Sequence, residues 1–274
     1  YTSLTDSLDF DFEFGNVWRI YQQENLVFFQ SEASIFIYDN SSLDIQVVKP
    51  NNTFHTMLAC EGDIFVRERG YGLKKWTGSG FELVTDGEKF EIYGVFDILP
   101  YSETQQLIVT QELGLLLMGR ESIKALHTDS SEALRNQYIV GGVQSENGSY
   151  FFNSLKYGVF EADRNGIMTN LYNTASGLKS DDIKNIFIDN YSNLWLATGN
   201  GISVINRSIP LSFYTEEVGL EGNVQCIAQF KNRTFAGTSV GLYWQNGDRH
   251  EFERIELEHQ VFDLKVVNDH LLIG

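Results

Sequence analysis

The sequence predicts an all-β fold made of repeated four-stranded antiparallel sheets, and three observations support this prediction. A short sequence motif recurs, in which a hydrophobic pair is followed by a turn of small residues and then by another apolar run. Its turn residue stands at positions 34, 72, 114, 158, 201 and 241, with spacings of 38, 42, 44, 43 and 40 residues. Within each repeat, apolar residues alternate with period two, as on a strand. A period of about 40 residues among alternating strands is typical of propeller blades. We therefore expect a β-propeller of about seven blades, the last of them incomplete.

The clearest repeat indicates how four strands fit into one blade. Alternating apolar residues predict strands over 183–188 and 194–198, and the tight turn 199–201 leads to a third strand over 202–206. A turn containing Pro follows; Pro is tolerated there because a turn residue need not donate a backbone hydrogen bond to a neighbouring strand. A fourth strand is expected over 211–215. The aromatic residues on such strands are expected to fill the wedge between blades.

The turns between the second and third strands depend on glycine. A reversal this tight usually needs a residue with positive φ, which glycine adopts without a steric clash. Ser34 stands at this position in the first repeat, so we expect a looser turn there. Asp189 follows a strand and is expected to cap its own turn rather than to bind a metal. The glycines expected at positive φ are Gly72, Gly114, Gly158, Gly201 and Gly241.

The two ends of the chain carry partial repeats. The segment 8–14 alternates without inner strands of its own, and 261–274 begins a seventh repeat. Pairing of these ends within one blade would close the ring and remove exposed sheet edges. We therefore expect residues 1–274 to form a single propeller domain, cut from a longer protein.

Composition excludes some classes of partner. The chain has 20 Lys and Arg residues against 37 Asp and Glu residues, a formal net charge of -17. Such a charge repels phosphate backbones and anionic lipid surfaces, so we expect no nucleic-acid partner. The apolar runs are too short to cross a bilayer. Cys60 and Cys226 lie in matching strands of distant repeats and are expected to be buried free thiols.

The sequence lacks the usual catalytic signatures. Its five histidines have no metal-ligand spacing, and it contains neither a Gly-x-Ser-x-Gly elbow nor a phosphate-binding glycine loop. The acidic pairs 181–182 and 216–217 each occupy one loop, whereas glycosidase carboxylates face each other across the sugar bond. We therefore expect no catalytic residue, no metal and no cofactor. A propeller enzyme acting on glycans remains as an alternative.

One repeat carries a family resemblance. The segment 177–189 and the following 193–202 resemble the two-component regulator propeller repeat, with a Gly-Leu-Ser-like start, a strand ending in Asp, and an Asn-Leu-Trp turn. Ser192 and Ala197 replace glycines of that pattern. The resemblance implies the periplasmic sensor domain of a membrane-bound two-component regulator, which responds to a glycan or other small molecule.

The same resemblance implies further features of the whole protein. The output domain and the membrane-spanning segment would lie outside this chain, and dimerisation through the sides of the propeller would suit signalling across a membrane. A propeller that only docks proteins is the main alternative to a ligand sensor. A broad charged or apolar patch on one face would indicate such a docking role.

In a propeller, the turns from strand two to three and the connections to the next blade converge on one face around the axis. Side chains on this face, at the opening of the central channel, are the expected ligand contacts. The mixture of amides, charges and tyrosines there suits hydrogen bonding and stacking. The predicted ligand-binding residues are Arg69, Tyr71, Glu112, Asn153, Lys156, Tyr157 and Asn200, with Gln111 and Ser239 in equivalent turns.

Overall fold

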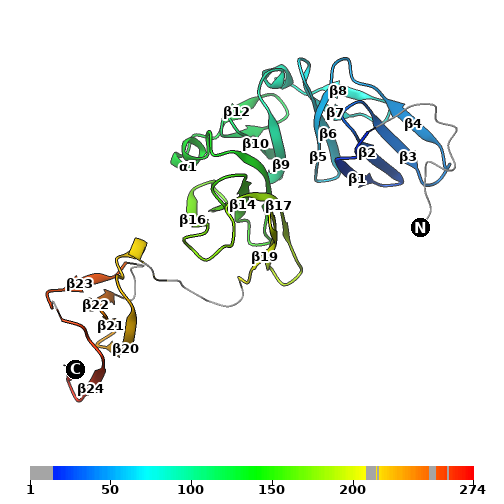
Figure 1. Cartoon of the computed structure of the whole chain (residues 1–274). Coiled ribbons are helices and arrows are strands. Elements are labelled where there is room, and N and C mark those ends of the chain that lie inside the picture. The colour runs from blue at the N-terminus through cyan, green and yellow to red at the C-terminus, as the bar shows by residue number, and fades with distance from the viewer. Residues whose placement is uncertain (1–14, 208–213, 215, 247–250, 258) are drawn as a thin grey trace. The chain divides into compact units, whose positions relative to one another are not determined.

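The computed structural model describes residues 15–207, 214, 216–246, 251–257 and 259–274. Over these residues the chain forms seven antiparallel sheets in succession, and within each sheet neighbouring strands are consecutive in the chain (Figure 1). Five sheets have four strands, the fifth sheet along the chain has three, and the seventh has two. This confirms the predicted all-β fold of propeller blades with an incomplete last blade.

The sheets are numbered 1 to 7 in chain order. Sheet 1 contains β1 (Arg19–Gln23), β2 (Leu26–Gln30), β3 (Ile35–Asp39) and β4 (Ile45–Val48). Sheet 2 contains β5 (Phe54–Cys60), β6 (Asp63–Glu68), β7 (Gly72–Trp76) and β8 (Phe81–Leu83). Sheet 3 contains β9 (Val95–Ser102), β10 (Gln105–Thr110), β11 (Leu115–Met118) and β12 (Ile123–Ala125). Sheet 4 contains β13 (Ile139–Gln144), β14 (Tyr150–Ser154), β15 (Val159–Ala162) and β16 (Met168–Tyr172).

The remaining sheets are shorter or lie later in the chain. Sheet 5 contains β17 (Ile183–Ile188), β18 (Leu194–Thr198) and β19 (Gly201–Ile205). Sheet 6 contains β20 (Val224–Phe230), β21 (Arg233–Thr238), β22 (Gly241–Asn246) and β23 (Glu253–Ile255), and sheet 7 contains β24 (Leu264–Val267) and β25 (His270–Ile273). Short helices are α1 (Asp129–Ala133) and the 3-10 turns η2 (Gly87–Phe90) and η3 (Glu216–Val218).

The hydrophobic cores lie between consecutive sheets. Phe28 of sheet 1 packs with Met57 of sheet 2, and Leu58 of sheet 2 packs with Ile108 of sheet 3. Similar cores join sheets 3 and 4, sheets 4 and 5, and sheets 6 and 7. Because side chains alternate across each strand, one sheet supplies residues to the cores on both of its faces. The sheets therefore pack face to face, as blades do.

The first strands of consecutive sheets lie next to one another. This holds for β1 with β5, β5 with β9, β9 with β13 and β13 with β17, and separately for β20 with β24. The first strand is thus the inner strand of each blade, and the fourth strand is the outer one. The positions where first strands begin are consequently brought close together.

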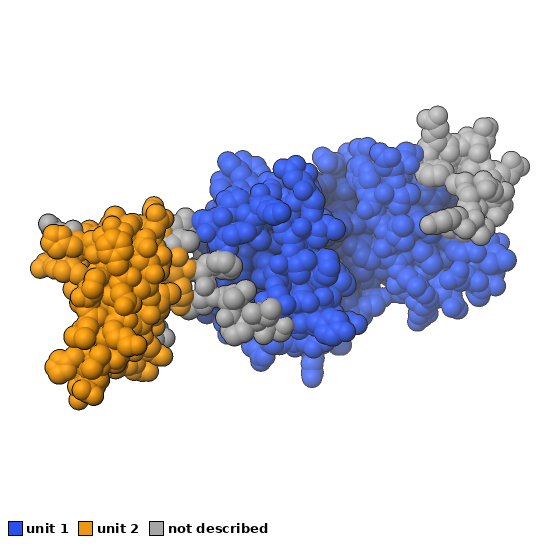
Figure 2. Space-filling view, turned by 60° about the horizontal axis from the view of Figure 1, so that its bottom comes forward, with its two compact units in different colours: residues 1–208 blue, residues 209–274 orange. Residues whose placement is uncertain are grey.

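The chain forms two compact units, Tyr1–Ser208 and Ile209–Gly274 (Figure 2). Sheets 1 to 5 belong to the first unit, and sheets 6 and 7 belong to the second. The predicted strand over 8–14, and with it the proposed ring closure, lies outside the described residues. The predicted strand over 211–215 also lies outside them, apart from Tyr214.

The turn glycines have the backbone conformation that the sequence predicts, with positive φ at all five positions. At Gly158, where φ is 90°, an added Cβ would lie 2.0 Å from the Tyr172 carbonyl oxygen. The expectation of a looser first turn is wrong. There the Ser31 N–H donates to the Ser34 carbonyl at 2.8 Å, and the Ser31 hydroxyl accepts from the Ser34 N–H at 3.1 Å, which closes the turn without glycine.

Asp189 caps its turn as predicted. Its carboxylate accepts hydrogen bonds from the backbone N–H groups of Tyr191 and Asn193, and from the Trp195 indole at 2.8 Å. The hydrogen bond from the Trp195 indole, together with those from Asn193 and Tyr191, lowers the pKa of Asp189 to about 2.

Two further properties bear on the sequence predictions. Cys60 and Cys226 are free thiols; Cys60 is buried as expected, but Cys226 is only half-buried. Wherever the structure describes a helix, that helix is too short or too polar to cross a bilayer.

Candidate functional site

One face of the first unit gathers the turns from strand two to three and the connections between sheets. The Arg69 N–H donates to the Thr53 carbonyl at 3.0 Å, and the Asn136 N–H donates to the Gln111 carbonyl at 2.8 Å. The Leu155 N–H reaches the Tyr138 carbonyl at 3.1 Å in the same way. Each turn is therefore fixed to the segment that leads into the next sheet. We call this surface the turn face.

The predicted ligand-binding residues of the first unit all lie at the turn face, but in different environments. Arg69, Tyr71, Glu112, Lys156, Tyr157 and Asn200 are exposed, and Gln111 is half-buried. Asn153 differs because its side chain is buried, and its Nδ2 donates to the Ile183 carbonyl at 3.0 Å, which ties sheet 4 to sheet 5. Ser239 lies in the second unit, where its hydroxyl accepts from the Asn223 N–H at 3.0 Å.

Two of the predicted residues form a small aromatic cluster with a third that the sequence did not reveal. The Lys156 Nζ lies 5.4 Å from the Tyr138 ring centroid and 5.3 Å from that of Tyr157. The two rings are 6.3 Å apart. Cation–π attraction holds the lysine over the rings. Tyr138 belongs to the connection between sheets, so its place beside Tyr157 follows only from the fold.

Beside these turns, the beginnings of four first strands enclose a pocket of about 260 Å³. We call it the axial pocket. Its lining comes from the segment entering β1, the end of β2, and the starts of β5, β9 and β13. The lining residues are Trp18, Arg19, Gln30, His55, Thr56, Phe96 and Val140.

Three of the lining residues occupy equivalent β-bulges. In sheet 2, Phe54 pairs with Glu68 and Thr56 pairs with Arg67, so His55 is an extra residue without a partner. In the same way, Phe96 of β9 and Val140 of β13 are extra residues without a partner on the neighbouring strand. Lys184 and Gln225 are the corresponding residues of sheets 5 and 6. A bulge re-aims a side chain relative to the regular strand.

The bulge positions follow the repeat, although the sequence alone did not reveal them. They fall at 55, 96, 140, 184 and 225, with spacings of 41, 44, 44 and 41 residues. The residues there are His, Phe, Val, Lys and Gln, so no common residue type marks the position. The repeat therefore conserves the position of the bulge and varies its chemistry, which suits a ring of residues that determine specificity.

Two buried polar groups at the axial pocket lack hydrogen-bond partners. The Gln30 side chain is fully buried, and its Oε1 accepts from the Met57 N–H at 2.8 Å. Its Nε2 has no partner among the described residues, and neither has the buried Nδ1 of His55. A buried polar group without a partner destabilises a protein by about 1–3 kcal/mol. A ligand that supplies the missing partners would recover this free energy.

Positive charge surrounds the axial pocket. Burial, with the positive charges of Arg67 and Arg69, lowers the pKa of His55 to about 4, so this imidazole is neutral at pH 7. Arg67 is 4% exposed and donates to the backbone carbonyls of Phe90 and Glu91, at 2.8 and 2.9 Å. In the described part of the chain, no ion pair neutralises Arg19, Arg67 or Arg69.

A buried carboxyl group stands near this cationic region. Burial raises the pKa of Asp97 to about 6, although the N–H groups of Gly142 and Ile98 and the charge of Arg19 act in the opposite direction. The Asp97 carboxylate accepts from the Gly142 N–H at 3.0 Å. Asp97 therefore serves to join β9 to β13 just behind the pocket.

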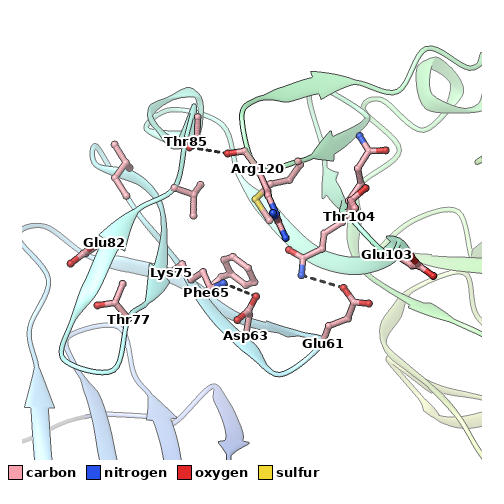
Figure 3. Close-up of a pocket in the computed structure, with 16 residues that line it drawn as sticks. Glu61, Asp63, Phe65, Lys75, Thr77, Glu82, Thr85, Glu103, Thr104 and Arg120 are labelled. Atoms are coloured by element: carbon pink, nitrogen blue, oxygen red, sulfur yellow. Dashed lines mark hydrogen bonds and ion pairs between the residues drawn. The ribbon is translucent and has the colours of Figure 1, made fainter.

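A larger groove of about 690 Å³ lies between sheets 2 and 3, at the strand ends opposite the turn face (Figure 3). Several of its polar groups pair with one another. Lys75 forms an ion pair with Asp63 at 2.7 Å, and the Thr85 hydroxyl donates to the Arg120 carbonyl at 3.4 Å. None of its described side chains has a buried polar atom without a partner. The axial pocket, although smaller, is the better candidate for a ligand site.

No family model matches the chain, and no curated protein matches it in sequence. Solved structures do match its fold. The extracellular domain of the one component system BT4673 from B. thetaiotaomicron is 20% identical, with a TM-score of 0.58 over 97% of this chain. The extracellular domain of the hybrid two component system BT3049 from B. thetaiotaomicron is 16% identical, with a TM-score of 0.59 over 94% of this chain.

This chain spans only 39% and 37% of the length of those two structures. At these identities the likeness concerns the fold. In fold, the chain resembles these extracellular domains of a one component and a hybrid two component system.

Proposed function

We propose that this chain is the ligand-sensing, periplasmic propeller of a membrane-bound two-component regulator that belongs to the two-component regulator propeller repeat family. Its ligand is a glycan or another small molecule bound in the axial pocket, and its output domain lies outside the chain. The single observation that carries this proposal is the pocket itself, where Gln30 and His55 present buried polar atoms without partners.

The composition of the pocket supports binding of a polar small molecule. Arg19, Gln30 and His55 offer hydrogen bonds, while Trp18 and Phe96 offer apolar ring surfaces. Ligand sites typically combine apolar walls with a few placed polar groups. The exposed Tyr138, Lys156 and Tyr157 provide a second contact area on the turn face, where a longer glycan would continue beyond the pocket.

The arrangement also supports signalling by a change of packing. The pocket is built from the first strands of sheets 1 to 4, so one ligand contacts four blades at once. A ligand shifts a conformational equilibrium only as far as it binds one state better than the other. Bridging several blades favours the state in which their inner strands are closest. In a dimer of such propellers, this change would be passed to the paired subunit.

We propose no catalytic activity for the chain. General acid–base catalysis needs groups within hydrogen-bond reach of one another and of the substrate. His55 is the titratable imidazole of the axial pocket, and its Nδ1 has no hydrogen-bond partner among the residues described. The chemistry of the response belongs to the output domain.

A thermal-shift screen against a panel of glycans and small metabolites tests this proposal. A ligand at 100 times its Kd stabilises the folded state by about 2.7 kcal/mol, which corresponds to a rise in Tm of about 5–10 °C for a chain of this size. We expect at least one panel member to raise Tm, and the variant Phe96→Ala to abolish that rise.

The matched control is Phe187→Ala. Phe187 is also an aromatic residue on a first strand, but it is exposed and does not line the axial pocket. This variant should keep the full ligand-induced shift. The proposal is wrong if no compound raises the Tm of the wild-type chain, an outcome that favours protein docking. It is also wrong if Phe96→Ala and Phe187→Ala respond alike.

A further inference from the structure

The axial pocket of this acidic protein is locally cationic. Arg19 lines the pocket, and the charges of Arg67 and Arg69 act on His55 within it. The chain as a whole carries a net charge of -17. At physiological ionic strength, charges in solvent are screened beyond about 8 Å, so the potential inside the pocket depends on nearby groups rather than on the net charge. These groups are the guanidinium groups and the carboxyl groups of Asp97 and Glu112, which interact with Arg19 and Arg67.

We propose that the axial pocket binds an anionic ligand the size of one sugar ring, whose carboxylate or sulfate group lies among Arg19, Gln30 and His55. This inference rests on the proposed sensing function and specifies the ligand class of the same site. A uronic acid and a sulfated sugar share the chemistry that these residues recognise.

The hydrogen-bonding groups of the pocket support an anion. Because the Gln30 Oε1 is occupied by the Met57 N–H, the group left for a ligand is the Nε2 donor. The guanidinium of Arg19 carries only donors, arranged in a fork that matches a carboxylate or sulfate. An anionic carboxylate or sulfate offers several acceptor sites and a charge to both residues at once, whereas a hydroxyl of a neutral sugar offers only two acceptor lone pairs and no charge.

The size and walls of the pocket define the remainder of the ligand. A volume of about 260 Å³ lies just below the roughly 300–1,000 Å³ of sites that hold drug-sized ligands, and it suits one ring. Trp18 and Phe96 supply aromatic surface, and Val140 supplies an aliphatic side chain. These residues fit the apolar faces of a sugar ring whose acidic group points toward Arg19.

Binding of an anion should also change the protonation of His55. The charges that act on this imidazole are those of Arg67 and Arg69, from sheet 2 and its turn. Arg19 of β1 lines the same pocket, and its charge acts on Asp97 of β9. Burial, together with the charges of Arg67 and Arg69, disfavours protonation of His55. A bound anion offsets their charge and accepts a hydrogen bond from the imidazolium, so binding takes up a proton. The affinity for an anion therefore increases as the pH falls from 7.5 to 5.5.

Isothermal titration calorimetry of the full chain tests this inference with three probes: D-glucuronate, D-glucose 6-sulfate and D-glucose. We expect the two anions to bind at least tenfold more tightly than glucose, and the ratio between the two anions to identify which acidic group is preferred. Arg19→Gln should weaken binding of the anions about tenfold, since charge-assisted hydrogen bonds are the strong ones, and should weaken binding of glucose less.

Gln30→Glu is a second, nearly isosteric variant. It keeps an oxygen for the Met57 N–H but replaces the Nε2 donor with an anionic acceptor, so it should abolish anion binding. The matched control is Arg120→Gln in the groove at the opposite strand ends (Figure 3), which should change nothing. Circular dichroism verifies that each variant is folded.

The pH dependence gives an independent readout. From pH 7.5 to 5.5, the affinity of the wild-type chain for the tighter anion should rise several-fold, and His55→Gln should reduce this rise to the part that protonation of Asp97 contributes. The inference is wrong if glucose binds as tightly as the anions, if Arg120→Gln weakens binding as much as Arg19→Gln, or if affinity is independent of pH. If glucose or another neutral sugar binds as tightly as the anions and Phe96→Ala abolishes that binding, the sensing function stands and only the ligand class is wrong. If none of the three sugars binds, this inference is wrong, and the thermal-shift panel decides whether the sensing function also fails.

Discussion

Buried polar side chains of this protein fall into two groups that differ in how well they are satisfied. Glu68 accepts hydrogen bonds from the backbone N–H groups of Asn51 and Asn52, and pairs with Lys74 at 2.6 Å. In the axial pocket, Gln30 and His55 each keep an atom without a partner. Satisfied groups stabilise the fold, and the unsatisfied atoms of Gln30 and His55 are available to a ligand. The Oδ1 atoms of Asn153 and Asn193 also lack a partner among the described residues, so it is the position of Gln30 and His55 in a pocket that makes them candidates for a functional role.

Glu68 gives a test of the structural group. Burial raises the pKa of its carboxyl, but the hydrogen bonds from Lys74 and Asn52 outweigh burial and lower the pKa below the ordinary value. Glu68→Gln leaves Lys74 without its charge partner and should lower the free energy of unfolding by about 2–4 kcal/mol at pH 7. Urea unfolding measures this loss.

The loss of stability caused by Glu68→Gln should depend on pH in a defined direction. The stabilisation by Glu68 is present above the pKa of the unfolded state, about 4.3, and is lost as the pH falls through the lower folded-state pKa. The difference between wild type and Glu68→Gln should therefore shrink in acid. Glu82→Gln, an exposed change in the same sheet, should alter stability by less than about 0.5 kcal/mol. Equal losses in both variants would contradict a special role for Glu68.

His55 should make the protein sensitive to mild acid. Its folded-state pKa of about 4 lies below the unfolded value of about 6.5, so its contribution to stability is complete above pH 6.5 and is lost as the pH falls through 4. Urea unfolding at a series of pH values should show a smaller acid loss in His55→Gln than in wild type. His127→Gln, at an exposed site, is the control and should follow wild type. The raised pKa of Asp97 has the opposite effect, because it increases the free energy of unfolding as the pH falls. This effect should be the same in all three proteins.

At the scale of the structural element, the turn and the bulge are the two devices that repeat. Four turns of the first unit place a glycine at the edge of the turn face, whereas the first turn closes through Ser31 and Ser34. Each bulge places one extra residue at the start of a first strand. The bulge adds a side chain without changing the number of paired residues. Different blades can therefore present different chemistry at the mouth while the sheets keep the same architecture.

Two turn glycines should respond differently to substitution by alanine. Gly158→Ala places a Cβ 2.0 Å from the Tyr172 carbonyl oxygen, so the backbone must move, and we expect a loss of about 3 kcal/mol or more. At Gly201, φ is 124° but no atom lies within 4 Å of the added Cβ, so only backbone strain of about 1–2 kcal/mol opposes the change. Chemical denaturation of both variants measures the difference, and equal losses would show that the contact with Tyr172 is unimportant.

At the scale of the whole molecule, the chain is divided into two units that each contain their own cores. The four cores between sheets 1 and 5 use residues of Tyr1–Ser208, and the two cores of sheets 6 and 7 use residues of Ile209–Gly274. Repeat architectures gain most of their stability from contacts between neighbouring repeats. The first unit should therefore be stable without the second.

Expression of residues 1–208 alone tests this expectation. The fragment contains the complete axial pocket. We expect a dispersed NMR spectrum, a β-sheet circular dichroism signal and a cooperative thermal transition, together with the same ligand response as the full chain. A fragment that is unfolded, or a transition that loses its cooperativity, would show that the second unit is required for the fold of the first.

Much of the fold could be predicted because its determinants are local. The strands predicted over 183–188 and 194–198 match β17 and β18. Five turn glycines and the Asp189 cap were also predicted, since each depends on residues within one turn. The conformation of the turn at Ser34 was not predicted, because the turn closes when the Ser34 N–H donates a hydrogen bond to the Ser31 hydroxyl rather than through a glycine.

The sequence by itself determined the period, the strands and the face on which the turns gather, because side-chain alternation and turn chemistry act over a few residues. Only the tertiary structure decided which side chains come together in the axial pocket. Bulges at His55, Phe96 and Val140 depend on the pairing register between strands. The burial of Gln30 without a partner for its Nε2 depends on the packing of sheet 1 against sheet 2. Contacts between residues about 40 positions apart leave no local pattern in the chain, so the pocket and its charge become visible only when the blades are assembled.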